Sequence, residues 1–165
     1  MLQGLENLKR LTTGALAELR ILLMELRPSA LIEASLATLM EQLAKSAMSV
    51  KRVTVSVNVT GEFVKLPPDV HVGLYRLAQE AVNNAAKHSK ATKINIALSG
   101  RQQDGVVIEV SDDGRGFDLK KYTPGLGLNI MCERGTAIGA FVDLRSEIDK
   151  GTRIVITWPA KNRSV

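Results

Sequence analysis

The stretch VIEVSDDGRGF, residues 107–117, runs from an apolar strand pattern directly into a turn with two acids and two glycines. Glycine permits tight backbone geometry and the close approach of a ligand. A carboxylate fixed at such a turn can accept a hydrogen bond from an amino group on a base. An ordinary Asp-Gly turn between strands explains the same letters equally well, so the flanking segments must decide between the two.

Strand and helix patterns alternate on the N-terminal side of this stretch. Residues 93–98 predict a strand that a hairpin, from Gly100 to Gly105, joins to the strand predicted at 106–111. Pro67-Pro68-Asp69 is a helix start signal, and residues 68–88 carry apolar side chains at helical spacing, so this segment predicts a long helix. Valines alternate with polar residues over 53–59, which is typical of a half-buried strand.

The C-terminal side continues with a loop, a helix and a second hairpin. Residues 112–125 are rich in Gly, Asp and Lys and predict the loop, and residues 126–138 predict the helix. Two further strands are predicted at 141–146 and 153–158, joined by a turn at Asp149-Lys150-Gly151.

The N-terminal part predicts two helices, residues 5–27 and about 31–49, separated by Pro28. In the first, Leu16, Leu19, Leu23 and Leu26 have the spacing of a helix-bundle seam. This stripe favours a dimer or bundle helix, although packing on its own domain also explains it.

The order of elements predicts an α/β fold. We expect a two-layer α/β sandwich: a mixed, mostly antiparallel sheet with helices on one face, preceded by a helical arm. The expected organisation is an arm at 1–28, one domain at 29–160 and a frayed tail at 161–165.

Composition narrows the classes of partner. The chain has 165 residues, a net charge of +5 and only 4% aromatic residues. Because its basic residues are scattered and aromatics for base stacking are few, we expect no nucleic-acid binding; an anionic ligand such as ATP or an acidic partner domain fits better. The single cysteine, Cys132, excludes an internal disulfide and a thiolate metal site. No apolar run approaches the ~18 residues of a membrane span, and we expect a cytoplasmic domain.

One edge of the predicted helix 68–88 carries polar residues one turn apart: Glu80, Asn84 and Lys87. Asn83, in contrast, points almost directly away from the apolar face. An acid, an amide and a cation stacked in this way can hold a magnesium ion and phosphates, since magnesium takes few oxygen ligands from protein. A solvated polar helix face explains the same stripe.

Two shorter glycine motifs follow. The sequence GLGL, residues 125–128, opens a helix, where free backbone N–H groups and the helix dipole favour anions. It matches neither the Walker pattern nor the dinucleotide fingerprint, and a plain helix cap explains it too. The sequence KGTR, residues 150–153, is by itself an ordinary turn.

The order and spacing of these motifs are more specific than any one of them. A helix with ExxxNxxKH, DDGRG after a strand, GLGL before a helix and Gly-Thr before a final strand resemble the ATPase domain shared by histidine kinases, gyrase-type enzymes, Hsp90 and MutL. The resemblance covers roughly residues 50–159 and implies the Bergerat ATP-binding fold. LYRLAQEA at 74–81 and MCER at 131–134 look closest to the NarL-partner subfamily of sensor histidine kinases.

The resemblance implies roles at the phosphate end of a nucleotide site that binds ATP and Mg²⁺. Asn84 would hold the magnesium ion. Glu80, the candidate catalytic residue, would sit near that ion or polarise the attacking group. Lys87 and His88 would lie near the phosphates, which Gly125, Leu126, Gly127 and Leu128 would wrap.

At the base end, the resemblance implies that Asp112 binds the adenine amino group. Gly114 and Gly116 would shape the adenine pocket and start a short lid at 117–124. Thr152 would support the adenine side, directly or through water.

One departure from the family concerns the phosphoacceptor. The chain has two histidines, His71 and His88, and neither lies in a dimerisation helix. Residues 18–28 are similar to the second helix of that subfamily's hairpin, so we expect a truncated chain: a histidine protein kinase domain unable to autophosphorylate.

The partners then expected are its own missing dimerisation helix, a homodimer in the full-length protein, and the receiver domain of a response regulator. The parent protein is membrane-bound or soluble. The alternatives are a nucleotide-binding regulatory module, a gyrase-type or Hsp90-type ATPase, and an anti-sigma kinase.

Overall fold

The computed structural model describes residue 12 and residues 28–50, 53–101, 105–119 and 126–159. The predicted helix at 5–27 and the predicted tail lie outside the described residues, apart from residue 12. The elements are, in chain order, α2 (Pro28–Glu33), α3 (Leu36–Val50), β1 (Thr54–Gly61), α4 (Pro68–His88), β2 (Lys93–Arg101), β3 (Gly105–Asp112), α5 (Leu126–Ala137), β4 (Phe141–Glu147) and β5 (Gly151–Trp158).

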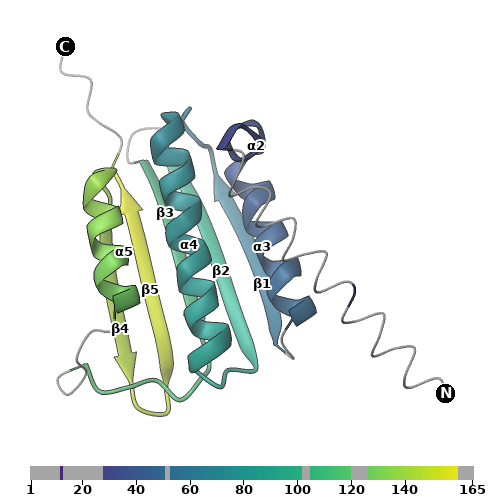
Figure 1. Ribbon diagram of the computed structural model, residues 1–165, viewed down its shortest axis with the longest axis vertical. Helices are drawn as coiled ribbons and strands as arrows, with labels where there is room; N and C mark the ends of the chain where they lie inside the picture. Colours follow the sequence, from purple (N-terminus) through teal and green to yellow (C-terminus); the bar gives the residue numbers. More distant parts are fainter. Residues whose placement is uncertain (1–11, 13–27, 51–52, 102–104, 120–125, 160–165) are drawn as a thin grey trace.

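The five strands form one sheet in the order β1-β2-β3-β5-β4. Strand β1 pairs with β2 in parallel, because the long helix α4 connects them, and every other pair is antiparallel. Helices α3, α4 and α5 cover one face of the sheet (Figure 1). The predicted two-layer α/β sandwich with a mixed, mostly antiparallel sheet is therefore confirmed.

The predicted helix at 31–49 is wrong in one respect: it is two helices, α2 and α3, with a break at residues 34–35. Ser35 causes the second start. Its hydroxyl accepts a hydrogen bond from the Thr38 backbone N–H at 3.1 Å, as an N-cap does. Pro28, expected to end the preceding helix, is the first described residue of α2, and the residues before it lie outside the described part of the chain.

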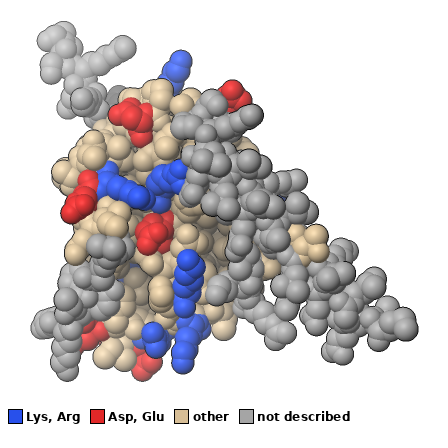
Figure 2. Space-filling view, in the orientation of Figure 1, with Lys and Arg blue, Asp and Glu red and all other residues tan. Residues whose placement is uncertain are grey.

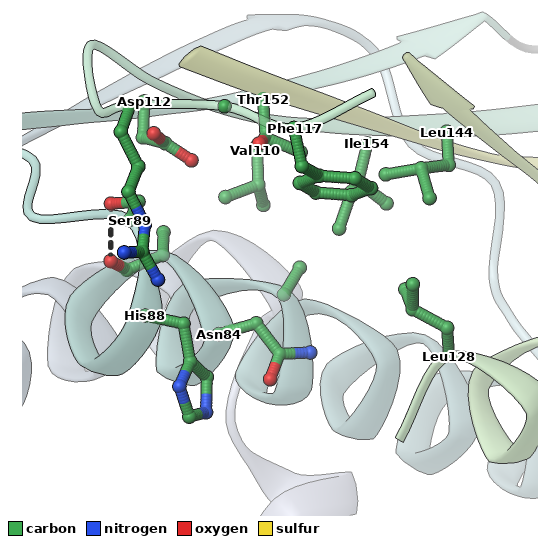
Figure 3. A pocket seen from close by; sticks show the side chains of 14 residues that line it. Asn84, His88, Ser89, Val110, Asp112, Phe117, Leu128, Leu144, Thr152 and Ile154 are labelled. Atoms are coloured by element: carbon green, nitrogen blue, oxygen red, sulfur yellow. Dashed lines mark hydrogen bonds between the residues drawn. The ribbon is translucent and has the colours of Figure 1, made fainter. Parts of the chain in front are cut away.

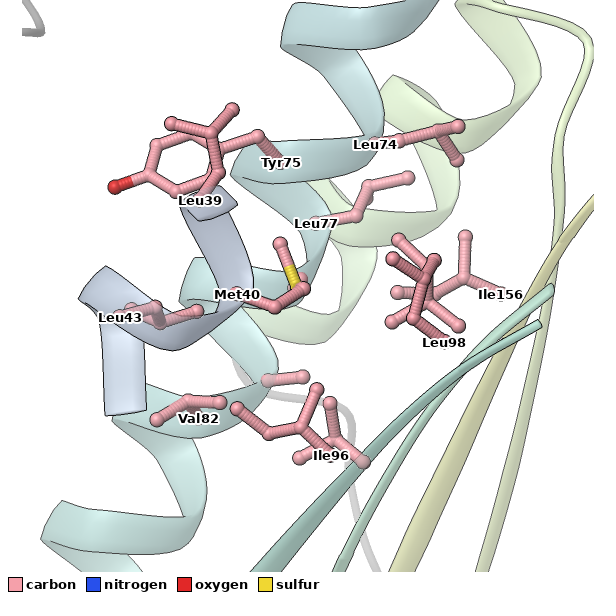
Figure 4. Packing of buried hydrophobic residues seen from close by; sticks show 14 of the residues in the cluster. Leu39, Met40, Leu43, Leu74, Tyr75, Leu77, Val82, Ile96, Leu98 and Ile156 are labelled. Carbon is pink, nitrogen blue, oxygen red and sulfur yellow. The ribbon is translucent and has the colours of Figure 1, made fainter. Parts of the chain in front are cut away.

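The core lies between α3, α4 and the sheet (Figure 4). The predicted apolar face of α4 is buried throughout, from Leu74 to Ala85. Leu39 and Met40 of α3 pack against it, as do Ile96, Leu98 and Ile156 of the sheet. In β1 the valine alternation holds only at the start, because Val55 is buried whereas Val59 is 41% exposed.

Two surface properties of the described residues bear on partners. Positive and negative side chains are interspersed on the helix-covered side, without one continuous basic patch among the atoms shown (Figure 2). Within the described segments, no helix combines the length and the hydropathy that a membrane span requires.

Candidate functional site

A cavity of about 540 Å³ opens between α4 and the end of the sheet where β3 finishes (Figure 3). This volume suits one small-molecule ligand. Its walls come from α4, β3, β4, β5, the loop after β3 and the first turn of α5. The lining residues are Ala81, Asn84, Ala85, His88, Ser89, Val110, Asp112, Arg115, Gly116, Phe117, Leu128, Leu144, Thr152 and Ile154.

Asp112 is the last residue of β3 and lies directly opposite Thr152 of β5. Its Oδ1 accepts a hydrogen bond from the Gly114 backbone N–H at 2.8 Å. Burial raises the pKa of the Asp112 carboxyl, and the backbone N–H groups of Gly114 and Thr152 partly oppose that rise. A half-buried carboxylate in a cavity wall is a strong acceptor for an N–H group of a ligand.

The neighbouring acid, Asp113, has a different task. Its carboxylate accepts hydrogen bonds from the Thr92 N–H, the Thr92 hydroxyl and the Lys93 N–H, all at 2.7–2.8 Å. The Lys93 backbone contact and the Thr92 hydroxyl lower the pKa of Asp113. Asp113 therefore ties the turn to the start of β2 and lies outside the cavity lining.

The two predicted glycines of this turn play unequal parts. Gly116 lines the cavity, whereas Gly114 is not part of the lining. A Cβ on Gly114 would lie 2.4 Å from the Ser89 carbonyl oxygen, so a bare backbone is required where the turn passes the end of α4. The Arg115 N–H donates to that same Ser89 oxygen at 2.8 Å, which fixes the turn to α4.

The polar edge of α4 divides between the cavity and its surroundings. Asn84 and His88 line the cavity, while the half-buried Glu80 and the exposed Lys87 lie outside the lining. Asn83 is also outside it. The Asn84 amide nitrogen lies 4.0 Å from the Met131 sulfur as a donor, which couples α4 to α5 and leaves the amide oxygen as the group with metal-binding character.

The second glycine motif is described only in part. Gly125 lies outside the described residues, and for Leu126 and Gly127 the structure gives the backbone at the start of α5. Leu128 lines the cavity, so the first turn of α5 borders it. Free N–H groups of a helix start are suited to anions there.

Sequence reasoning missed several residues of this site. Ser89, buried at the end of α4, donates its hydroxyl to the Ala85 carbonyl at 2.6 Å and accepts from the Ala91 N–H at 3.0 Å. Arg115 and Phe117 sit in the predicted turn and its exit without having been chosen. Ser146 of β4 lies behind Thr152, with the two hydroxyl oxygens 3.0 Å apart. A serine directly after the helix-ending KH was the available signal for Ser89.

The cavity is amphipathic. Val110, Leu144 and Ile154 form an apolar wall, with the Phe117 ring beside them (Figure 3). Asp112 and Thr152 lie toward one end of that wall, and Asn84 and His88 lie across the cavity from it, on α4 (Figure 3). An apolar slot with a carboxylate at its end suits a flat heteroaromatic base that carries an N–H donor, and the N-terminal turn of α5 nearby suits anionic groups.

Comparisons with known proteins agree with this geometry. Residues 69–162 match the family described as histidine kinase-, DNA gyrase B- and HSP90-like ATPase. The chain is 34% identical over 158 residues to the sensor protein VraS of Staphylococcus saprophyticus, covering 95% of this chain and 45% of that protein. It is 32% identical to VraS of Staphylococcus aureus, with the same coverage. The chain thus spans less than half the length of these relatives.

Solved structures show the same fold. The blue-light activated histidine kinase of Erythrobacter litoralis EL346 superposes with a TM-score of 0.65 at 22% identity, covering 78% of this chain and 42% of that one. The histidine kinase AdeS of Acinetobacter baumannii gives 0.64 at 17% identity, covering 87% and 79%. The ATP-binding domain of PrrB from Mycobacterium tuberculosis gives 0.60 at 22% identity, covering 78% and 96%.

Proposed function

This chain belongs to the family of histidine kinase-, DNA gyrase B- and HSP90-like ATPases, as the ATP-binding catalytic domain of a sensor histidine kinase, and we propose that it presents the γ-phosphoryl group of ATP to a histidine on a dimerisation hairpin. We assign residues 29–160 to the ATP-binding domain and residues 1–28 to the second helix of such a hairpin. The phosphoryl group would then pass to an aspartate on a response-regulator receiver domain, in a cytoplasmic homodimer.

The observation that carries this proposal is the half-buried Asp112 carboxylate at the end of an apolar slot. Adenine fits the slot with its amino group toward Asp112. The phosphates then extend toward Asn84, His88 and the first turn of α5, which border the same cavity. The exposed Lys87, which is not part of the lining, would supply positive charge near the outer phosphates.

The donor set also fits magnesium. Among the described residues, no three His, Cys, Asp or Glu side chains gather as a metal cluster. An Asn84 amide oxygen beside nucleotide phosphates matches the preference of magnesium for one or two protein oxygens. When bound, magnesium neutralises charge on the phosphates during transfer. Asn84 would hold the ion, and Glu80, one turn earlier on α4, would be the second ligand.

The transfer itself demands little general-base catalysis. A neutral imidazole nitrogen attacks the γ-phosphorus in line, and the bond from that phosphorus to the β–γ bridging oxygen breaks, so that ADP leaves. Glu80 need only orient the imidazole. His71 is unsuited as the acceptor because its Nε2 is buried, and His88 lies on the cavity wall, so the acceptor belongs to the hairpin.

We expect this chain to phosphorylate a supplied hairpin. The chain, magnesium and γ-labelled ATP are mixed with a peptide that carries the hairpin with its histidine, and acid-labile, base-stable label on the peptide is measured. A hairpin with His→Gln is the matched control and should stay unlabelled. Release of inorganic phosphate with no label on the histidine hairpin would contradict the kinase proposal and favour an ATPase.

Asn84→Ala is expected to remove the contribution of magnesium and leave the base end of the site intact. In calorimetric titrations, the wild-type chain should bind ATP about tenfold more tightly with magnesium than without it, and Asn84→Ala should show about the same affinity in both. Asn83→Ala, one position along the same helix and outside the lining, is the matched control. Equal magnesium dependence in all three chains would exclude Asn84 as a ligand.

A further inference from the structure

The Ser146 hydroxyl sits at the meeting point of β4, β5 and the loop that leaves the DDGRG turn. It lies 3.0 Å from the Phe117 backbone nitrogen, 3.1 Å from the Gly151 carbonyl oxygen and 3.0 Å from the Thr152 hydroxyl oxygen. The β-ladder pairs Ser146 with Thr152 and pairs Thr152 with Asp112. Asp112, Thr152 and Ser146 therefore form one row across three strands, on the face that looks toward the helices.

The chemistry of these neighbours fixes where each hydrogen lies. A serine hydroxyl has one hydrogen and two lone pairs. The Phe117 N–H can only donate, so it uses one lone pair, and the Gly151 carbonyl can only accept, so it takes the hydrogen. The Thr152 hydroxyl must then donate to the remaining lone pair of Ser146. The opposite arrangement would leave lone pairs of Ser146 and Gly151 facing each other at 3.1 Å.

This arrangement determines what Thr152 offers to the cavity it lines. Its single hydrogen is committed to Ser146, so only lone pairs remain for a ligand. Asp112, beside it in the row, is a carboxylate and also accepts. This end of the cavity therefore presents acceptors on two neighbouring side chains.

We propose that Ser146 is a specificity-determining residue: by holding the Thr152 hydroxyl as an acceptor, it makes this end of the cavity select a purine with a 6-amino group over one with a 6-oxo group. The inference rests on the proposed function and adds to it a residue without cavity contact of its own. An amino group offers two hydrogens to the two acceptors. An oxo group would bring its lone pairs against both, and such mismatched polar groups discriminate strongly.

The test compares ATP with ITP, which differ only at the 6-position and N1 of the purine. Dissociation constants are measured by calorimetry for the wild-type chain and for Ser146→Ala. In the variant the Thr152 hydroxyl is free to turn and donate to an oxo group. We expect the ratio of the ITP constant to the ATP constant to fall by about fivefold or more. A merely structural loosening would weaken both nucleotides alike and leave that ratio unchanged, which would overturn the inference.

Three further variants sharpen this test. Ser146→Thr keeps the hydroxyl and should retain the wild-type ratio. Thr152→Val removes the acceptor hydroxyl itself and should lower the ratio. When Thr152→Val is already present, adding Ser146→Ala should not change the ratio further. Thr152→Val also tests the inference if Ser146→Ala fails to fold. Ser99→Ala, on the open face of β2, is the matched serine control and should change nothing.

The outcomes separate this inference from the proposed function. A wild-type chain that binds neither nucleotide would overturn both. A wild-type chain that prefers ATP, with the same preference in Ser146→Ala and Thr152→Val, would overturn the role of Ser146 and leave ATP binding standing.

Discussion

Asp112→Asn is expected to weaken ATP binding by about 100-fold while leaving the fold intact. In the proposed site the carboxylate would accept a hydrogen bond from the adenine amino group in a half-buried position, where a charged hydrogen bond is worth more than at the surface. The amide substitute keeps one acceptor oxygen but brings an NH₂ group that opposes the purine amine. Calorimetric titration of both chains with ATP, with and without magnesium, measures the loss.

The same substitution should not lower stability. Burial raises the pKa of Asp112 above its usual 3.8. For an acid with a raised folded-state pKa, folding stability is lost as pH rises from about the unfolded value through the raised one. At neutral pH the ionised Asp112 therefore lowers the free energy of unfolding, and Asp112→Asn removes that penalty. We expect an unchanged or higher melting temperature at pH 7, together with the weaker ATP binding.

Asp113→Asn is the matched control, and its effects should be the reverse. The folded-state pKa of Asp113 is lowered by its hydrogen bonds to Lys93 and Thr92. The stability that it contributes is therefore present above pH 3.8 and is lost as pH falls through the lowered value. Asp113→Asn should melt lower than the wild-type chain at pH 7 and bind ATP within about threefold of it. Equal losses of ATP affinity in both variants would contradict the separate tasks of the two acids.

Sequence patterns predicted the elements because each pattern is local. The 3.6-residue period of α4 and the alternation along β3 and β5 depend on neighbours within a few positions. The break between α2 and α3 was not predicted, because it depends on one capping hydrogen bond to Ser35 within an otherwise continuous apolar stripe. The polar stripe on α4 was predicted from the same helical period. The structure places Asn84 of that stripe in the cavity lining and the half-buried Glu80 outside it.

The contacts that shape the Asp112 end of the cavity are not local. Phe117 and Ser146 are 29 positions apart in the chain, and only the antiparallel arrangement of β3, β5 and β4 brings them together. Neither residue carries a spacing signal of its own. Likewise the Ser89 carbonyl meets Arg115 only after α4 has crossed the sheet. Sequence order indicated several motifs whose residues line the cavity, whereas the hydrogen-bond network behind them required the fold.

Gly151→Ala is expected to destabilise the domain by about 3–5 kcal/mol and to weaken ATP binding with it. Gly151 opens β5 with a φ of +81°, which L-residues rarely adopt, and an added Cβ would lie 1.9 Å from the Asp112 carbonyl oxygen. Neither backbone can yield without shifting the end of β3 that carries the Asp112 side chain. The turn at KGTR, which looks ordinary in the sequence, thus packs its Gly151 backbone closely against the backbone of Asp112. Chemical denaturation and ATP titration of the same preparation measure both effects.

Gly139→Ala separates strain from contact. Gly139 has a similar φ of +71°, but a Cβ there would meet nothing within 4 Å. Its substitution should therefore cost only the conformational part, about 1 kcal/mol, with unchanged ATP affinity. If the two alanine variants lose equal stability, the positive φ alone explains the effect, and the close approach of Gly151 to Asp112 contributes nothing. A larger loss in Gly151→Ala, together with weaker ATP binding, shows that the backbone behind Asp112 holds the base end of the site in place.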